Sequence, residues 1–170
     1  MYSAGVAATT TDVVDLTGVP RTKRSPATFT AVRVNGVDAS GRATDGIVSG
    51  GSIEITLTIA GDQAVSRVVA GVDIVDDRGR AAAGVSTDSR DVWFDVEDGG
   101  TRTVTLTLRD VELRAGAYTL GLSLRTMAEV LDEADAVVRF KVEARPDAPY
   151  ERWLGWPLAA YLPRYEVKVG

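Results

Sequence analysis

Apolar and polar residues alternate along most of the middle of the chain. In residues 52–59, every second residue is Ile or Leu, and polar residues occupy most of the positions between them. Residues 101–108 and 117–125 repeat this pattern, with Thr, Ser and Gly opposite Val and Leu. Successive side chains of a β-strand point to opposite faces of a sheet. The alternation therefore predicts strands with one buried and one exposed face.

More strands are predicted between turn signals. Their segments are 29–34, 67–75, 81–87, 91–96 and 137–143. Asn35-Gly36 is a strong turn signal and ends the first of them. A tight hairpin is predicted at residues 76–79, where Gly79 supplies a positive φ. Residues 126–135 are predicted to form one or two helical turns, and no other segment has a helical pattern.

The predicted fold class is all-β, because seven or eight short strands follow one another with turns between them. This spacing favours an antiparallel β-sandwich of two sheets. Helices do not alternate with the strands, which argues against a parallel sheet. We expect residues 1–28 to be a linker or leader, residues 29–143 to form the sandwich and residues 144–170 to be a C-terminal extension.

The extension ends in residues 164–170, which have the composition of a strand. About twenty residues tether this strand to the sandwich, so it can pair with its own sheet or with a neighbour's. Exchange of such an element between two copies is a low-cost route to a dimer. Aromatic residues gathered at 150–165 are predicted to form a packing plug or interface.

Composition excludes several kinds of chemistry. The chain has 170 residues, no His and no Cys, so it has no His-based triad, thiol nucleophile, disulfide or zinc site of the usual ligands. A net charge of −5 disfavours nucleic-acid binding. No apolar run is long enough to span a bilayer, and the N-terminus lacks the pattern of a signal peptide. The Asp clusters do not follow a calcium-loop pattern. We expect no cofactor, no metal and no catalytic residue.

Three motifs follow one another in the sequence. The first motif consists of Gly71, Asp76, Gly79, Gly84, Ser86 and Thr87. The second consists of Leu113, Gly116, Tyr118, Leu120, Leu122 and Leu124. The third consists of Ala136, Phe140 and Val142. In this order the motifs resemble the C-terminal carbohydrate-binding domain of Wzt-type ATP-binding subunits. The resemblance covers residues 29–143, and no phosphate-binding G-x-x-x-x-G-K-[ST] loop accompanies it.

The resemblance implies an immunoglobulin-like sandwich and a function in ABC-transporter export of bacterial O-antigen polysaccharide. It implies that the domain recognises the glycan, often at its modified terminus, and forms a homodimer by exchanging C-terminal strands. The implied partners are the transporter's ATPase domain and membrane subunit in the parent protein. The implied location is cytoplasmic, at the inner face of the inner membrane. The fragment would not be an enzyme, since the ATPase lies elsewhere in the parent.

The outward positions of residues 117–125 are the best candidates for a sugar-binding face. Short or planar polar side chains suit hydroxyl pairs, and aromatic rings suit the C–H faces of sugars. Gly121 leaves a gap in this strip. We expect neighbouring strands to add Lys141 as well. The candidate carbohydrate-binding residues are Asp73, Ser86, Trp93, Thr119, Ser123, Arg125 and Arg139.

Simpler interpretations of these residues stay open. Each polar residue, taken alone, fits an exposed sheet face with cross-strand charge pairs. Trp93 and Phe94 are adjacent, so one ring points in and the other out, and the outward ring fits a loop or dimer contact better than a sugar. Two other functions remain open: an immunoglobulin-like adhesive module with a protein partner and, less favoured, a small glycan-active enzyme whose paired carboxylates would need a pocket.

Overall fold

The computed structural model describes residues 6–7, 12–21, 25–145 and 164–170. Its elements, in chain order, are β1 (Val6–Ala7), β2 (Val14–Asp15), β3 (Ala27–Val37), β4 (Ile47–Val48), β5 (Ser52–Gly61), β6 (Val65–Asp76), β7 (Ala81–Ser86), η1 (Asp88–Arg90), β8 (Phe94–Val96), β9 (Thr101–Arg109), β10 (Gly116–Arg125), β11 (Val130–Glu143) and β12 (Arg164–Val169). The all-β class is confirmed, and within the described ranges the one helical element is the short 3₁₀ turn η1.

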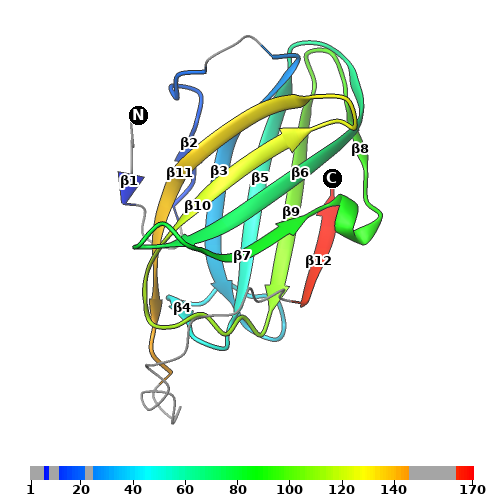
Figure 1. Cartoon of the computed structure of the whole chain (residues 1–170). Coiled ribbons are helices and arrows are strands. Elements are labelled where there is room, and N and C mark those ends of the chain that lie inside the picture. Colours follow the sequence, from blue (N-terminus) through cyan, green and yellow to red (C-terminus); the bar gives the residue numbers. More distant parts are fainter. Residues whose placement is uncertain (1–5, 8–11, 22–24, 146–163) are drawn as a thin grey trace.

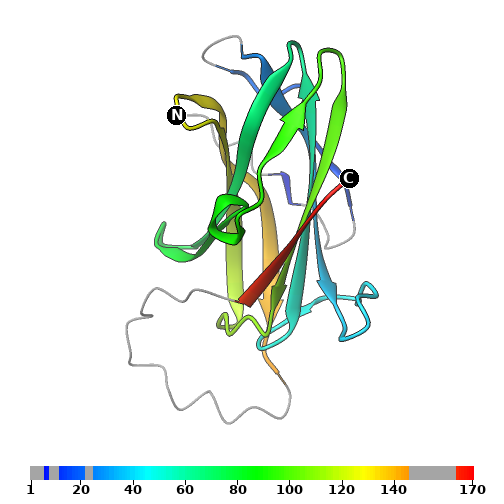
Figure 2. The same ribbon diagram turned by 90° about the vertical axis from the view of Figure 1, so that its right-hand side faces the viewer.

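Two sheets pack face to face (Figures 1 and 2). The seven-stranded sheet has the order β1-β11-β10-β6-β7, with β4 also paired to β11 and β8 to β6. The five-stranded sheet has the order β12-β9-β5-β3-β2. Most neighbouring strands are antiparallel, but the two-residue strands β1 and β4 run parallel to β11. The predicted antiparallel sandwich is therefore confirmed.

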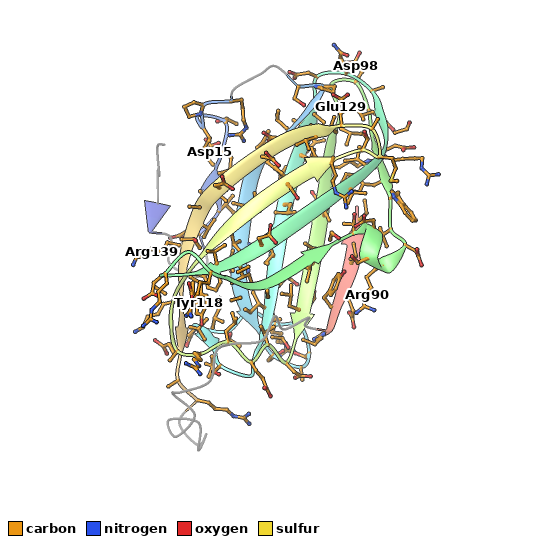
Figure 3. The ribbon with its side chains drawn as sticks, viewed as in Figure 1. Asp15, Arg90, Asp98, Tyr118, Glu129 and Arg139 are labelled. Atoms are coloured by element: carbon orange, nitrogen blue, oxygen red, sulfur yellow. The ribbon has the colours of Figure 1, made fainter. Side chains whose placement is uncertain are left out.

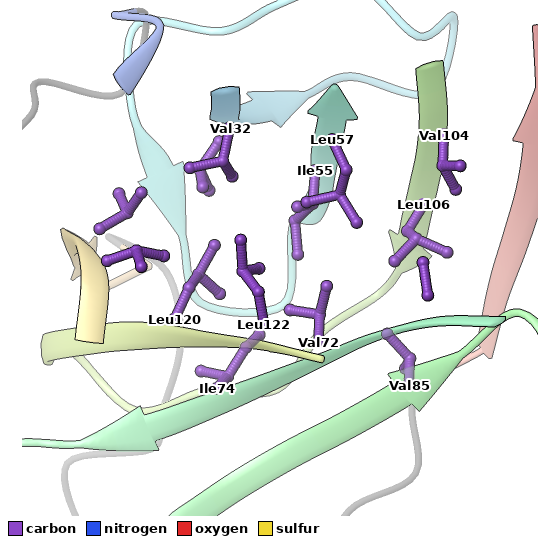
Figure 4. Close-up of a cluster of buried hydrophobic side chains, with 14 of the residues drawn as sticks. Val32, Ile55, Leu57, Val72, Ile74, Val85, Val104, Leu106, Leu120 and Leu122 are labelled. Carbon is purple, nitrogen blue, oxygen red and sulfur yellow. The ribbon is translucent and has the colours of Figure 1, made fainter. Parts of the chain in front are cut away.

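The alternation in the sequence becomes the division between core and surface. In β5, buried and half-buried residues alternate along the whole strand. β10 has the same alternation, which points Leu120 and Leu122 inward. Figure 4 shows these side chains meeting Val32, Ile55 and Leu57 of the opposite sheet. Burial of such apolar surface is the main stabilising contribution to folding.

The predicted turn at Asn35-Gly36 is wrong. β3 continues through both residues, and Asn35 and Gly36 pair with Glu54 and Ile53 of β5. The physical reason for the glycine is close packing, since a Cβ on Gly36 would collide with the carbonyl oxygen of Gly46. Gly36 thus lets the backbone at Gly46 approach the strand closely, which is a use of glycine that needs no turn.

The helical turns predicted at residues 126–135 are also wrong. A short turn starts at Thr126, whose Oγ1 accepts hydrogen bonds from the backbone N–H groups of Ala128 and Glu129. β11 then begins at Val130. Asp132, in the middle of the segment, is buried and accepts a 2.9 Å hydrogen bond from the backbone N–H of Phe29. This contact between distant residues overrides the local helical preference.

The N-terminal segment contributes to the core before the first long strand begins. Val14 and Leu16 are buried, and β2 pairs with β3. Further along, the guanidinium Nε of Arg21 lies 2.7 Å from Oδ1 of the buried Asp132. An ion pair and two apolar side chains therefore hold residues 14–21 against both sheets.

The predicted C-terminal strand is present as β12. It pairs antiparallel with β9, from Arg164 opposite Arg109 to Val169 opposite Val104. Tyr165 is buried at the start of the strand. In this structure β12 completes the sheet of its own chain; the prediction of strand exchange concerns a second copy and stays a prediction. Four of the five predicted aromatic-cluster residues lie outside the described residues.

Candidate functional site

A shallow depression lies on the outer face of the seven-stranded sheet, which faces the viewer in Figure 1. We call it the Gly121 depression, and its volume is about 320 Å³. β6, β10 and β11 supply its lining residues, which are Asp73, Val75, Thr119, Gly121, Leu122, Ser123, Glu133, Asp135 and Ala136. Strand alternation explains this set, because most of these residues occupy the outward positions of their strands.

A glycine creates the hollow. Gly121 of β10 pairs with Asp73 of β6, and Asp73 pairs in turn with Gly84 of β7. A Cβ on Gly121 would lie 3.8 Å from Oδ1 of Asp135 and 3.9 Å from Cβ of Asp73. The two carboxylate side chains therefore flank a floor that has no side chain of its own.

A β-bulge in β11 begins at Asp135, beside the depression. Leu120 of β10 pairs with Val138, but Leu122 pairs with Ala134, so three residues of β11 lie opposite Gly121 alone. Within the bulge, Ala136 has a φ of 51°, a left-handed conformation that is uncommon for a residue with a Cβ. Bulges are frequent beside functional sites, where they change the direction of a side chain.

A polar cluster adjoins the depression on the side of β7 and η1. Ser123 and Ser86 both pair with Gly71, one on each side of β6. The Ser86 Oγ donates a 2.6 Å hydrogen bond to Oδ1 of Asp88, and the Arg125 Nη2 lies 2.6 Å from Oδ2 of the same carboxylate.

The environment of Asp88 favours its charged form. Partial burial raises the pKa of this carboxyl, but the hydrogen bond from Ser86 and the charge and hydrogen bond of Arg125 outweigh it, so the pKa lies below its usual value. The charge of Arg125 is thus neutralised by the Asp88 carboxylate.

The predicted site residues fall into three groups. Asp73, Thr119 and Ser123 line the depression. Ser86 and Arg125 belong to the adjoining polar cluster. The other two residues do not line the depression, and each is described below.

Trp93 lies between η1 and β8 and is 37% exposed, whereas Phe94 beside it is buried. The guanidinium of Arg67 lies 5.3 Å from the Trp93 ring centroid, which is cation–π distance. Arg139 is exposed on β11 opposite Thr119, near the edge of the sheet (Figure 3). Lys141 lies opposite Ala117, one outward position further along β11.

Sequence reasoning missed Glu133 and Asp135. Both were assigned to the helical turns that the structure replaces with β11. Two features obscured the outward positions of Glu133 and Asp135 in the alternation of β11. One is the buried Asp132 at an inward position, and the other is the bulge that breaks the period of two.

The described residues hold no group of three or more acidic side chains placed to bind a metal ion. Among the same residues, no helix is long and apolar enough to cross a membrane. The carboxylates of the depression are exposed on an open sheet face, where they can accept hydrogen bonds.

The fold and this open polar face define a β-sandwich domain with a candidate ligand-binding sheet. A model of the Wzt C-terminal domain family matches residues 20–152. The chain belongs to this family, and it is therefore a polysaccharide-related domain of the ABC-transporter subunit type named Wzt. No curated protein matches the chain.

The solved structure of a Wzt C-terminal domain agrees with this assignment at the level of fold. The crystal structure of the C-terminal domain of Wzt is similar, with a TM-score of 0.63 and 15% identity, covering 81% of this chain and 86% of that one. A putative β-galactosidase from Bacteroides fragilis gives a TM-score of 0.44 at 18% identity, covering 65% of this chain and 16% of that one. A CARDB domain from Pyrococcus furiosus, solved with di-metal ions, gives a TM-score of 0.40 at 15% identity, with coverages of 77% and 99%.

Proposed function

We propose that this domain binds the O-antigen polysaccharide that its transporter exports, and that the Gly121 depression is where the sugar binds. The observation that supports this most strongly is the hollow itself. It lies on an exposed sheet face in a family of polysaccharide transporter domains, and short polar side chains surround it. The terminus of the glycan is the segment we expect it to hold.

The chemistry of the lining suits a saccharide. Thr119 and Ser123 can each donate and accept a hydrogen bond, and carboxylates accept from pairs of sugar hydroxyls. Val75 and Ala136 offer small apolar patches to ring C–H groups. The floor at Gly121 lets a flat ring approach the backbone closely, as glycine does at many ligand sites.

We propose that binding involves no chemical change to the glycan. A hydrolase of the common type needs two carboxylates on opposite sides of a glycosidic bond, with one of them held as an acid. Asp73 and Asp135 are both exposed on an open face. This open environment supports a role in holding sugar.

The proposed partners are the exported glycan, the transporter's ATPase domain and its membrane subunit. The domain would act at the cytoplasmic side of the inner membrane, where the polysaccharide is handed to the transporter. In this role it selects cargo, and the ATPase of the parent subunit supplies the energy for export.

We further propose a homodimer that exchanges β12. The edge of β9 receives this strand, and the preceding segment 146–163 is long enough for β12 to reach a second copy, since an extended chain spans about 3.4 Å per residue. Deletion of residues 160–170 should then yield monomers or aggregates in sedimentation experiments. A truncated chain that remains a stable dimer would show that another surface holds the two copies together.

Calorimetric titration tests the binding proposal. The O-polysaccharide of the organism that encodes the chain is titrated into the wild type and into a Thr119→Val, Ser123→Ala double variant. We expect saturable binding that the double variant weakens at least about tenfold, because each hydroxyl supplies hydrogen bonds of roughly 1 kcal/mol. A matched control, Thr56→Val with Thr58→Val on the outer face of the other sheet, should bind like the wild type. Equal binding by all three proteins, or none, contradicts the proposal.

A further inference from the structure

The charged side chains that line the Gly121 depression have one sign. Asp73, Glu133 and Asp135 line it and are all exposed, and no Lys or Arg is among its lining residues. Asp73 and Asp135 flank the floor directly, as the positions around Gly121 show. A ligand in the hollow is therefore close to several carboxylates at once.

The nearby basic side chains lie outside the lining of the depression. Arg125 pairs with Asp88 at 2.6 Å, outside the depression. Arg139 and Lys141 lie on β11 opposite Thr119 and Ala117, towards the edge strand β1, and neither lines the hollow. The charged groups that line the depression are therefore the three carboxylates.

We infer that the Gly121 depression accepts a neutral or amino-bearing sugar and rejects one that carries phosphate, sulfate or carboxylate. Ionised carboxylates only accept hydrogen bonds, so the bound sugar has to present O–H or N–H donors. An anionic group in the hollow would meet like charges at short range, and such charges repel. This inference rests on the proposed function, and it names the chemical class that the same site selects.

Strand register fixes the acidic lining that β11 supplies. Glu133 pairs with Ser123 and Ala134 with Leu122, so Asp135 is the next outward position and lies opposite Gly121. The bulge follows directly, with a left-handed backbone at Ala136. Strain of this kind persists only where the surrounding structure holds it in place.

A glycan array tests the inference. It presents neutral bacterial oligosaccharides beside counterparts that carry an amine, a phosphate or a sulfate on the same terminal sugar, at low ionic strength. We expect the wild type to bind the anionic members at least about tenfold more weakly than their neutral counterparts. High salt should reduce this difference, because the charges are exposed and therefore screened.

Two variants with the same change in net charge locate the effect. The site variant carries Asp73→Asn, Glu133→Gln and Asp135→Asn, and the control carries Asp62→Asn, Asp98→Asn and Glu112→Gln at exposed positions elsewhere.

We expect the discrimination to fall below about twofold in the site variant and to persist in the control. Anionic glycans bound as tightly as neutral ones by the wild type would overturn the inference while leaving the proposed function intact. Discrimination that is equal in the two variants would do the same. If no glycan is bound at all, the proposed function fails, and the inference fails with it.

Discussion

The hydroxyl of Tyr165 donates a 2.9 Å hydrogen bond to the backbone carbonyl of Ser86, so the C-terminal strand contacts the opposite sheet beside the proposed site. Tyr165 is buried, and the guanidinium of Arg90 lies 4.6 Å from its ring centroid. β12 therefore supports the end of β7, from which the Ser86 side chain bonds to Asp88. The Tyr165 contact at the start of β12 thus stabilises the residues of the polar cluster, whichever copy supplies the strand.

Tyr165→Phe removes this hydrogen bond and keeps the ring. We expect the free energy of unfolding to fall by about 1 kcal/mol, because the Ser86 carbonyl loses its partner in a partly buried place. Urea denaturation measures the change. Glu166→Gln on the same strand is the control, since its contact with Arg109 is exposed and 3.5 Å long. An effect no larger than that of the control would mean that the hydrogen bond adds nothing to stability.

Asp132→Asn should destabilise the chain by about 2–3 kcal/mol. The substitution leaves the half-buried Arg21 without its charge partner, and breaking a buried pair is costly even where the pair itself adds little. A double-mutant cycle with Arg21→Met measures the coupling. We expect an interaction energy of about 1 kcal/mol or more. Strictly additive effects would show that the N-terminal segment is not held by this contact.

The Asp88 ion pair gives a pH dependence of known sign. Its hydrogen bonds and Arg125 lower the pKa of Asp88 in the folded state, while partial burial opposes them. A lowered folded pKa adds stability above the unfolded value of about 3.9, and this stability is lost as the pH falls through the folded pKa.

The difference in unfolding free energy between the wild type and Asp88→Asn should therefore shrink as the pH falls from about 5 to about 2. Chemical denaturation across this range measures it. Groups other than Asp88 titrate in both proteins and largely cancel. A difference that stays constant over the whole range would contradict the assignment.

Gly121→Val should separate binding from stability. The new Cβ meets its nearest neighbours at 3.8 and 3.9 Å, which is ordinary contact, so the strand can accept it. Val favours strands where Gly weakens them, and we expect stability to stay level or rise by up to about 1 kcal/mol. The side chain fills the hollow, so glycan affinity should fall at least about tenfold. A less stable variant, or one that binds normally, contradicts this picture of the floor.

Alternation was enough to predict the fold because it is a local signal. The inward positions of Leu120 and Leu122 follow from a period of two that each strand carries in its own sequence. The Asn35-Gly36 turn and the helix at 126–135 failed for the opposite reason. In both places the deciding contact is with another strand: Asn35 and Gly36 pair with β5, and Asp132 accepts a hydrogen bond from Phe29 of β3.

Strand alternation predicted the positions of only some residues of the candidate site. Asp73, Thr119 and Ser123 occupy regular outward positions and line the depression, and their role in sugar binding stays a prediction. Asp135 also follows Glu133 at an outward position, but its segment was predicted to be helical, and no pattern in the sequence marks where β11 gains its extra residues against β10. Arg125 lies at an outward position near the depression, but its charge is neutralised by Asp88 of η1.

Mapping backbone amide chemical shifts during titration with the cognate O-polysaccharide tests the central claim most directly. The account predicts that the largest saturable changes centre on Gly121 and spread to its neighbours on β6 and β11. The outer face of the five-stranded sheet, including β5, should stay unchanged. Changes confined to that other sheet, or an unchanged spectrum at saturating polysaccharide, would contradict the assignment of the depression as the glycan site.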